Sequence, residues 1–283
     1  MSSFKSYLAW SLFLLPTVLF SQRDTSKITF LPSDRLFQPI IFDPTESQAY
    51  GTIAPYWEEG NYTDDLYLPF GMGFYKGFLR WNTGRPSEIG FDFSAHTQFI
   101  WTENDGKIER NLLNSDFKVS VMWNKQLNDQ HSYRLRFYHV SSHLGDDYVI
   151  RNGITSFFPN PNNYEQLDFT WSFIKNVTRY YAGLGMVVRP ETIRKRFSSQ
   201  FGSQLEKPLS TKWPLGITAG FDLKILEQHD FNPSVKAAFG LRIGQSDKMP
   251  LRIVAEYYRG NLPYSPFEFM RVQWIGAGLY FSP

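Results

Sequence analysis

Apolar and polar residues alternate along most of the chain from about residue 66 to its end. In residues 213–225 every odd position is apolar, and the even positions carry glycine, proline, threonine, aspartate or lysine. Residues 166–173, 233–244 and 251–257 repeat this alternation. Successive side chains of a β-strand point to opposite faces, so each segment would have one apolar and one polar face. The pattern therefore predicts an all-β protein built from amphipathic strands.

The length of the alternating runs favours a membrane barrel over a soluble β-sandwich. Strands of soluble proteins average about 5–6 residues, whereas a tilted strand that crosses a bilayer needs about 9–11. The runs here extend over about 9–13 residues, and their polar face is rich in glycine, which suits a crowded barrel interior. Residues 274–281 (WIGAGLYF) resemble the aromatic-ended terminal strand by which bacterial outer-membrane proteins are recognised for insertion. We therefore predict a transmembrane, antiparallel, up-and-down β-barrel over residues 47–283, with Trp171, Trp213 and Trp274 on its outward face.

We expect about twelve strands, with ten as the second choice, because an even number returns both chain ends to the periplasm. The expected strands lie near residues 47–57, 66–81, 88–101, 113–124, 131–143, 147–157, 164–175, 178–189, 213–226, 233–244, 250–259 and 270–281. The alternation is weakest at 47–57 and 147–157. Twelve strands place residues 58–65, 102–112 and 260–269 outside the cell, but they put the long segment 190–212 on the periplasmic side. That last placement conflicts with the rule that long loops of such barrels face outward.

The N-terminus has the form of an export signal. Lys5 precedes an apolar stretch at 8–20 that Pro16 interrupts and that is too short for a transmembrane helix. We therefore expect a signal peptide at 1–21 and a location in the outer membrane of a Gram-negative bacterium. Residues 22–46 show no alternation and would form a periplasmic lead-in or fold back into the lumen. The expected partners are outer-membrane lipids, lipopolysaccharide and, during insertion, the barrel-assembly machinery.

Composition and charge exclude several classes of protein. The 29 Lys and Arg residues against 27 Asp and Glu residues give a net charge of +2, without the basic excess of a nucleic-acid-binding protein. The absence of Cys excludes disulfides, thiol nucleophiles and thiolate metal sites. The alternation assigns these charged residues to the interior: Glu88, Asp92, His96, Asp116, Lys118, Arg134, Arg136, Asp168, Arg179, Asp222, Lys224, Lys236, Arg242, Arg252 and Glu256. Their mixed signs favour a paired, side-chain-filled lumen, with a narrow solute channel as an alternative.

Residues 139–147 (HVSSHLGDD) carry the densest chemistry of the chain. The alternation places His139, Ser141 and His143 on the outward face, where polar residues need an explanation. A serine close to a histidine on one strand face supplies a nucleophile and a general base. Asp146 and Asp147 could orient a histidine or, as hard oxygen donors, bind Ca²⁺, and no other cofactor is expected. Alternatively, these residues form the extracellular rim and contact loop backbone or lipopolysaccharide head groups.

Two resemblances bear on this segment. Residues 31–37 (LPSDRLF), 39–44 (PIIFDP) and 139–146 (HVSSHLGD) resemble a bacterial family, domain of unknown function 1207, over nearly the whole mature chain. That family implies no activity. The His139-Val-Ser141 sequence is similar to the His-x-Ser pair of the outer-membrane lipid A deacylases and phospholipase A. This second resemblance implies that Ser141 is a nucleophile and His139 its base, with a third residue, an acid or Asn, on a neighbouring strand that the sequence does not identify.

The leading functional prediction is therefore an outer-membrane barrel of structural or binding role with a charged, filled lumen. The first alternative is an outer-leaflet lipid ester hydrolase that uses Ser141 and His139, with His143 or Asp147 in an orienting role. The second alternative is a narrow solute channel. Release of fatty acid separates the first alternative from the others, and conductance identifies the second.

Overall fold

The computed structural model describes residues 27–155, 162–189, 194–210, 212–245 and 248–281, so the predicted signal peptide lies outside the described residues. The strands are β1 (Ile28–Phe30), β2 (Ala49–Glu58), β3 (Asn61–Trp81), β4 (Ser87–Asn104), β5 (Lys107–Gln126), β6 (His131–Leu144), β7 (Asn163–Lys175), β8 (Thr178–Arg189), β9 (Phe197–Pro208), β10 (Leu215–Leu226), β11 (Pro233–Ile243), β12 (Leu251–Asn261) and β13 (Arg271–Phe281). The helical segments are α1 (Asp146–Arg151) and the 3₁₀ helix η1 (Glu227–His229). Within the described part of the chain, no helix is both long and apolar enough to cross a membrane.

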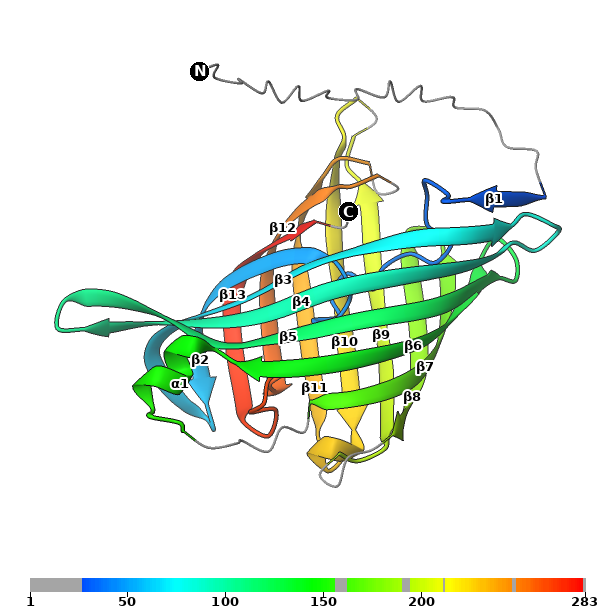
Figure 1. The fold of residues 1–283 in the computed structure, drawn as a ribbon. Helices are drawn as coiled ribbons and strands as arrows, with labels where there is room; N and C mark the ends of the chain where they lie inside the picture. The colour runs from blue at the N-terminus through cyan, green and yellow to red at the C-terminus, as the bar shows by residue number, and fades with distance from the viewer. Residues whose placement is uncertain (1–26, 156–161, 190–193, 211, 246–247, 282–283) are drawn as a thin grey trace, which may run out of the picture.

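Strands β2 to β13 form a closed barrel (Figure 1). Each strand pairs antiparallel with the next in sequence, and β13 pairs with β2, with Trp274 opposite Tyr56, so that the sheet has no free edge. β1 lies outside this ring and pairs with the last residues of β3, where Ile28 faces Trp81. The structure thus confirms the all-β, up-and-down antiparallel barrel of twelve strands.

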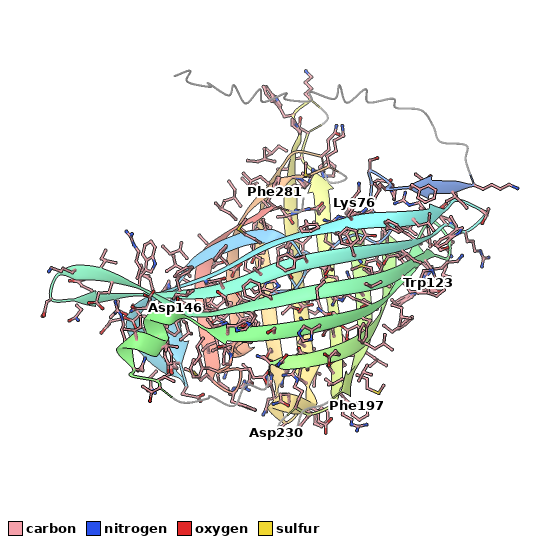
Figure 2. All side chains as sticks on the ribbon, in the orientation of Figure 1. Lys76, Trp123, Asp146, Phe197, Asp230 and Phe281 are labelled. Atoms are coloured by element: carbon pink, nitrogen blue, oxygen red, sulfur yellow. The ribbon has the colours of Figure 1, made fainter. Side chains whose placement is uncertain are left out.

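The two ends of the barrel differ in their connections. One end, here called the terminal end, carries the last residue of β13 and the short turns that follow β3, β5, β7, β9 and β11. The other end, called the loop end, carries α1, η1 and the longer connection between β12 and β13. Figure 2 shows Asp146, Phe197 and Asp230 at the loop end, and Trp123 and Phe281 toward the terminal end. Because long loops of bacterial barrels face outward, the loop end corresponds to the extracellular side of the expected topology.

The predicted strand at 147–157 is wrong, and a strand was missed at 197–208. Residues 146–151 form α1, whose first turn contains Asp146 and Asp147, the residue type that the dipole of a helix N-terminus favours. β9 (Phe197–Pro208) escaped detection because its outward face carries Ser199 and Ser203 between the apolar residues, which breaks the apolar period. The two errors cancel in the strand count. They also resolve the conflict over a long periplasmic segment at residues 190–212. β9 is a strand of the barrel wall, and only short connections remain before and after it.

The interior is lined by charged and aromatic side chains. Most of the charged residues that the alternation assigns to the lumen are buried, and several pair with one another, including Lys236 with Glu256 and Arg252 with Glu206. Trp274 is also inside, with 1% of its surface exposed and its ring stacked on Tyr258 at 4.0 Å. The prediction that Trp274 faces outward is therefore wrong. Trp274 lies on the same face of β13 as the glycine residues of that strand, and this face points into the barrel.

Residues 36–48 run through the barrel interior, and we call this segment the plug. Its residues Phe37, Ile40, Ile41 and Phe42 are almost completely buried. Gly220 on β10 makes room for it, because a Cβ at that position would lie 2.7 Å from the ring of Phe42. The plug connects β1 to β2, both of which begin near the terminal end, so it enters and leaves the lumen from that end.

Candidate functional site

The last residues of β6 form a polar cluster on the outer surface, next to the loop end. Side chains of β6 alternate as the sequence predicts: Phe137 is exposed on the outside, whereas Ser142 is buried inside and donates a hydrogen bond to Asp116. The parity of Phe137 places His139, Ser141 and His143 on the same outward face. Polar side chains therefore replace apolar ones where β6 approaches its end.

Ser141 is hydrogen bonded to a histidine. Its hydroxyl oxygen lies 3.0 Å from Nε2 of His143, and the pair is exposed. The ring of His143 rests beside Phe117 on the neighbouring strand β5, with ring centroids 5.9 Å apart. The hydrogen bond that the sequence suggested between Ser141 and His139 is thus made instead with the second histidine.

His139 has a different partner, which sequence reasoning missed. Its Nδ1 lies 3.1 Å from Oε1 of Glu165, which faces His139 across the β6–β7 pairing. The two side chains are 40% and 32% exposed. Glu165 is an acid on the neighbouring strand, the kind of third residue that the sequence left unidentified. The sequence does contain a signal for Glu165. It is a charged residue at a position of β7 where the alternation otherwise puts apolar, outward-facing residues such as Phe169.

Ser141 stands between two imidazoles on one face. Residues two positions apart on a strand share a face, so His139 and His143 flank Ser141 along the outward face of β6. Within the described residues, Nε2 of His139 has no hydrogen-bond partner of its own, while Glu165 fixes the ring through Nδ1. A nucleophile, an adjacent base and a carboxylate that orients the base are the parts needed for covalent ester hydrolysis.

Asp146 and Asp147 stand apart from this cluster. Both lie in the first turn of α1, and Asp147 accepts a hydrogen bond from the backbone N–H of Leu112 on β5 at 3.0 Å. No hydrogen bond joins Asp147 to either histidine of the cluster. Among the residues that the structure describes, no three His, Asp or Glu side chains gather as metal ligands. Ca²⁺ takes six to eight oxygen ligands, so these two carboxylates do not by themselves make a calcium site.

The barrel is similar to solved structures of outer-membrane phospholipase A. An active-site mutant of the Escherichia coli protein gives a TM-score of 0.59 at 9% sequence identity, over 87% of this chain and 93% of that chain. The Salmonella typhi phospholipase dimer with bound calcium gives a TM-score of 0.55 at 9% identity, over 83% and 90% of the two chains. At such low identity the likeness establishes the fold, a barrel of the type found in outer-membrane proteins, and assigns no role to a residue.

A family model also covers the chain. The family described as "Protein of unknown function (DUF1207)" matches residues 19–282, which confirms the resemblance drawn from residues 31–44 and 139–146. No curated protein matches the sequence. The chemistry of the site must therefore be inferred from its own side chains.

Proposed function

Since this chain belongs to the DUF1207 family, which carries no known activity, we propose its function from the site itself: the protein is a lipid ester hydrolase of the outer membrane of a Gram-negative bacterium. The observation that carries the proposal is the outward-facing cluster of Ser141, two flanking histidines and Glu165. A buried polar cluster would be explained as part of the core. This cluster faces away from the barrel, so packing of the core does not explain it.

In the proposed reaction Ser141 is the nucleophile. Its hydroxyl turns to Nε2 of His139 and gives that nitrogen its proton as Oγ attacks the ester carbonyl carbon. The proton passes to the leaving alcohol oxygen, and the acyl group stays on Ser141. Water then attacks the acyl-serine with His139 again as the base, which releases the fatty acid and restores the hydroxyl. Glu165 holds the ring through Nδ1 and stabilises the imidazolium that forms in each step. His143 holds the Ser141 hydroxyl in the resting state.

The surroundings of the cluster favour a lipid as the substrate. Exposed apolar residues flank it on the outside, including Phe137 on the same strand and Phe117 and Val119 on β5. Such an apolar band matches the face that a transmembrane barrel turns to the bilayer. The position near the loop end, which we take to be the extracellular end, supports a site in the outer leaflet. Because the plug occupies the interior, the substrate arrives laterally from the bilayer.

Phospholipid and lipopolysaccharide both carry esters of the required kind. We propose these outer-leaflet lipids as the partners of the mature protein, and the barrel-assembly machinery as its partner during insertion. Asp146 and Asp147 would enter the reaction only if substrate brought further oxygen ligands for Ca²⁺, so activity is to be measured with and without this ion.

The proposal is tested by the release of fatty acid from lipid in mixed micelles with purified, refolded protein. Ser141→Ala and His139→Ala should each lower the rate by several orders of magnitude, because removal of one member of such a set disables the whole. Glu165→Gln should lower the rate about 10²- to 10⁴-fold, because the His139 ring loses the group that orients it. His143→Ala should retain activity, since His143 only holds the resting hydroxyl. Ser203→Ala, an outward serine on β9, is the matched control.

The same assay contains the results that would overturn the proposal. If the wild type releases no fatty acid from phospholipid or lipopolysaccharide, with and without Ca²⁺, the cluster is a rim that contacts head groups and the barrel has a structural or binding role. If His143→Ala abolishes activity and His139→Ala does not, the hydrolase stands but its base is the other histidine.

A further inference from the structure

The interior of the barrel contains a ring of cations around the plug, independent of the outward-facing site. Five cationic side chains from four strands point at this segment: Lys118 (β5), Arg134 and Arg136 (β6), Arg179 (β8) and Lys224 (β10). Each of their ammonium or guanidinium groups contacts the plug, and Arg136 and Arg179 also bond Asp168 and Ser172 on the neighbouring strand β7. We call these five residues the cationic ring.

The plug meets the cationic ring with negative groups. Glu46 accepts two hydrogen bonds from Arg134, at 2.8 and 3.0 Å, and its second oxygen lies 3.6 Å from Arg136. Asp43 lies 2.5 Å from Nζ of Lys224. Both carboxylates are almost fully buried, Glu46 with 3% and Asp43 with 1% of its surface exposed.

Backbone and hydroxyl oxygens of the plug complete the contacts. Arg179 donates to the carbonyl oxygens of Gln38 and Pro39, each at 2.8 Å. Lys118 donates to the carbonyl of Thr45, and Lys224 donates to the Thr45 hydroxyl at 2.7 Å. The plug therefore presents oxygen atoms to all five cations, as a bound anion would.

The plug lowers the positive charge of this region. The strands contribute the five cations of the ring and three nearby carboxylates, Asp92, Asp168 and Asp222, which interact with Lys118, Arg136 and Lys224 respectively, so the strands alone leave an excess of positive charge. Asp43 and Glu46 of the plug offset this excess. Arg35, just before the plug, interacts with Glu46, so withdrawal of this part of the chain removes two negative charges and one positive charge.

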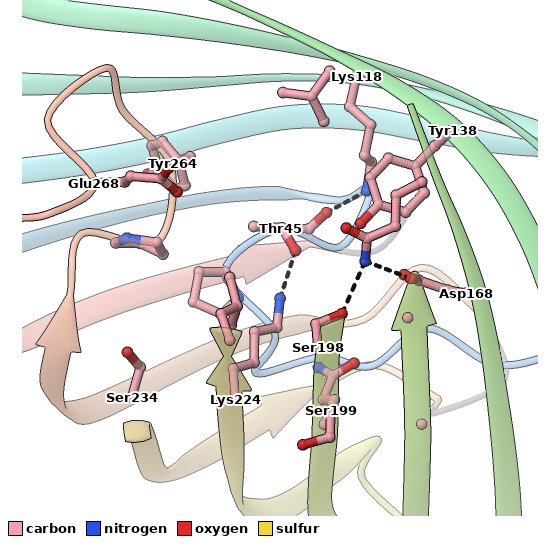
Figure 3. Close-up of a pocket in the computed structure, with 18 of the residues that line it drawn as sticks. Thr45, Lys118, Tyr138, Asp168, Ser198, Ser199, Lys224, Ser234, Tyr264 and Glu268 are labelled. Carbon is pink, nitrogen blue, oxygen red and sulfur yellow. Dashed lines mark hydrogen bonds between the residues drawn. The ribbon is translucent and has the colours of Figure 1, made fainter. Parts of the chain in front are cut away.

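A cavity continues beyond the plug toward the loop end. It has a volume of about 110 Å³ and extends from Thr45, Lys118 and Lys224 to Tyr264 and Glu268, as Figure 3 shows. Its lining mixes charged and polar side chains with apolar ones such as Val140 and Leu184, and it joins the cationic ring to the connections of the loop end. The space taken by the plug is itself wide enough for a polypeptide that enters and returns on the same side.

From these observations we propose that the lumen is a passage for small anions, such as carboxylates or inorganic phosphate, and that the plug closes it by occupying the anion site with its own oxygens. This inference goes beyond the proposed lipid hydrolysis and does not depend on it. With the plug withdrawn, the excess positive charge of the cationic ring selects anions over cations.

The test uses the full chain and an engineered disulfide that fixes the plug and can be reduced. Oγ of Ser47 in the plug lies 3.3 Å from Oγ of Ser94 on β4, and the chain has no native Cys. Ser47→Cys with Ser94→Cys should therefore form one disulfide that fixes the plug. Added to Asp43→Asn and Glu46→Gln, which remove the negative charges of the plug, this lock gives a protein that is closed when oxidised and open when reduced.

Conductance in planar bilayers under a KCl gradient reads out the result. We expect no openings from the oxidised protein. After reduction with dithiothreitol we expect discrete openings whose reversal potential is shifted toward the chloride equilibrium potential. Adding Lys224→Ala should move that potential toward zero. The inference is overturned if the reduced protein, shown to be folded by its heat-modifiable migration on gels, does not conduct, selects cations, or conducts equally when oxidised.

A second measurement keeps the native charges in case the multiple variant does not fold. In a protein with Ser47→Cys alone, inorganic phosphate should compete with the plug for the cationic ring and speed the labelling of the buried thiol. Sodium chloride at the same ionic strength is the control. Equal labelling rates in the two salts would contradict the competition between anion and plug.

Discussion

Loss of the Glu46 carboxylate should release the plug, and the structure sets the size of the effect. Burial by itself raises the pKa of Glu46, but Arg134 and Arg136 outweigh burial and lower the pKa from 4.5 to about 2. A lowered folded-state pKa means that the charged carboxylate stabilises the docked plug at any pH above its unfolded value. A difference of about 2.5 pKa units corresponds to roughly 3 kcal/mol. Removal of one partner from a buried ion pair independently costs about 3–5 kcal/mol.

The assay is thiol labelling of a single cysteine. Ser47→Cys places a thiol in the plug at a position with 1% of its surface exposed, in a chain with no other Cys. When labelling requires transient release of the plug, a loss of roughly 3 kcal/mol raises the labelling rate about 10²-fold. We therefore expect this increase for Glu46→Gln at pH 7. Glu103→Gln, at an exposed position of β4, is the matched control and should leave the rate unchanged.

The pH dependence gives the sign of the same effect. The advantage of the wild type over Glu46→Gln should be fully present above about pH 4.5 and should be lost as the pH falls toward 2. Hydrogen exchange of the backbone amides of residues 36–48, corrected for the intrinsic exchange rates, measures this loss of stability across the same pH range. A wild-type labelling rate in Glu46→Gln, or a difference between the two proteins that grows on acidification, would show that the Glu46 carboxylate does not hold the plug.

Three further predictions concern the interior and the loop end. Trp274→Ala should lower the free energy of unfolding in urea by about 3–5 kcal/mol, because it empties a buried site, and an unchanged value would place this ring outside the core. A Cβ at Gly220 would lie 2.5 Å from the backbone oxygen of Ser203 and 2.7 Å from the ring of Phe42, so Gly220→Val should displace the plug and speed its thiol labelling, and a wild-type rate would mean that the plug docks elsewhere. Burial raises the pKa of Glu268, but Arg194 lowers it below its ordinary value overall, so the β12–β13 loop should become more sensitive to protease as the pH falls below about 4.5. Glu268→Gln should be sensitive at neutral pH as well, and protection of that variant would refute the role of the ion pair.

Much of the fold follows from the sequence because strand alternation is a local signal. The alternation within one strand shows which of its side chains face inward. It therefore assigned the charged residues to the lumen and Ser141 to the outward face without information on the neighbouring strands. β9 escaped because Ser199 and Ser203 point outward, where the apolar period needs apolar residues. Trp274 was misplaced because an aromatic residue near a strand end suits both an interfacial belt and a packed interior.

The site depended on contacts that no local pattern contains. Glu165 meets His139 only because β6 and β7 pair across the intervening α1 segment, and the register that joins them is a property of the barrel. The choice of Ser141 between His139 and His143 is likewise a matter of side-chain rotation. The plug has no period at all, since its residues are held by side chains from distant strands, such as Arg134 and Lys224.

One measurement tests most directly the claim that Ser141 is the nucleophile of a lipid hydrolase. A sulfonyl fluoride with a long alkyl chain transfers its sulfonyl group to an activated serine and releases fluoride, and mass spectrometry of the digested protein locates the adduct. We expect one adduct on Ser141, strongly reduced in His139→Ala and present in His143→Ala. A wild-type protein that is folded, embedded in lipid and unlabelled at Ser141 would contradict it.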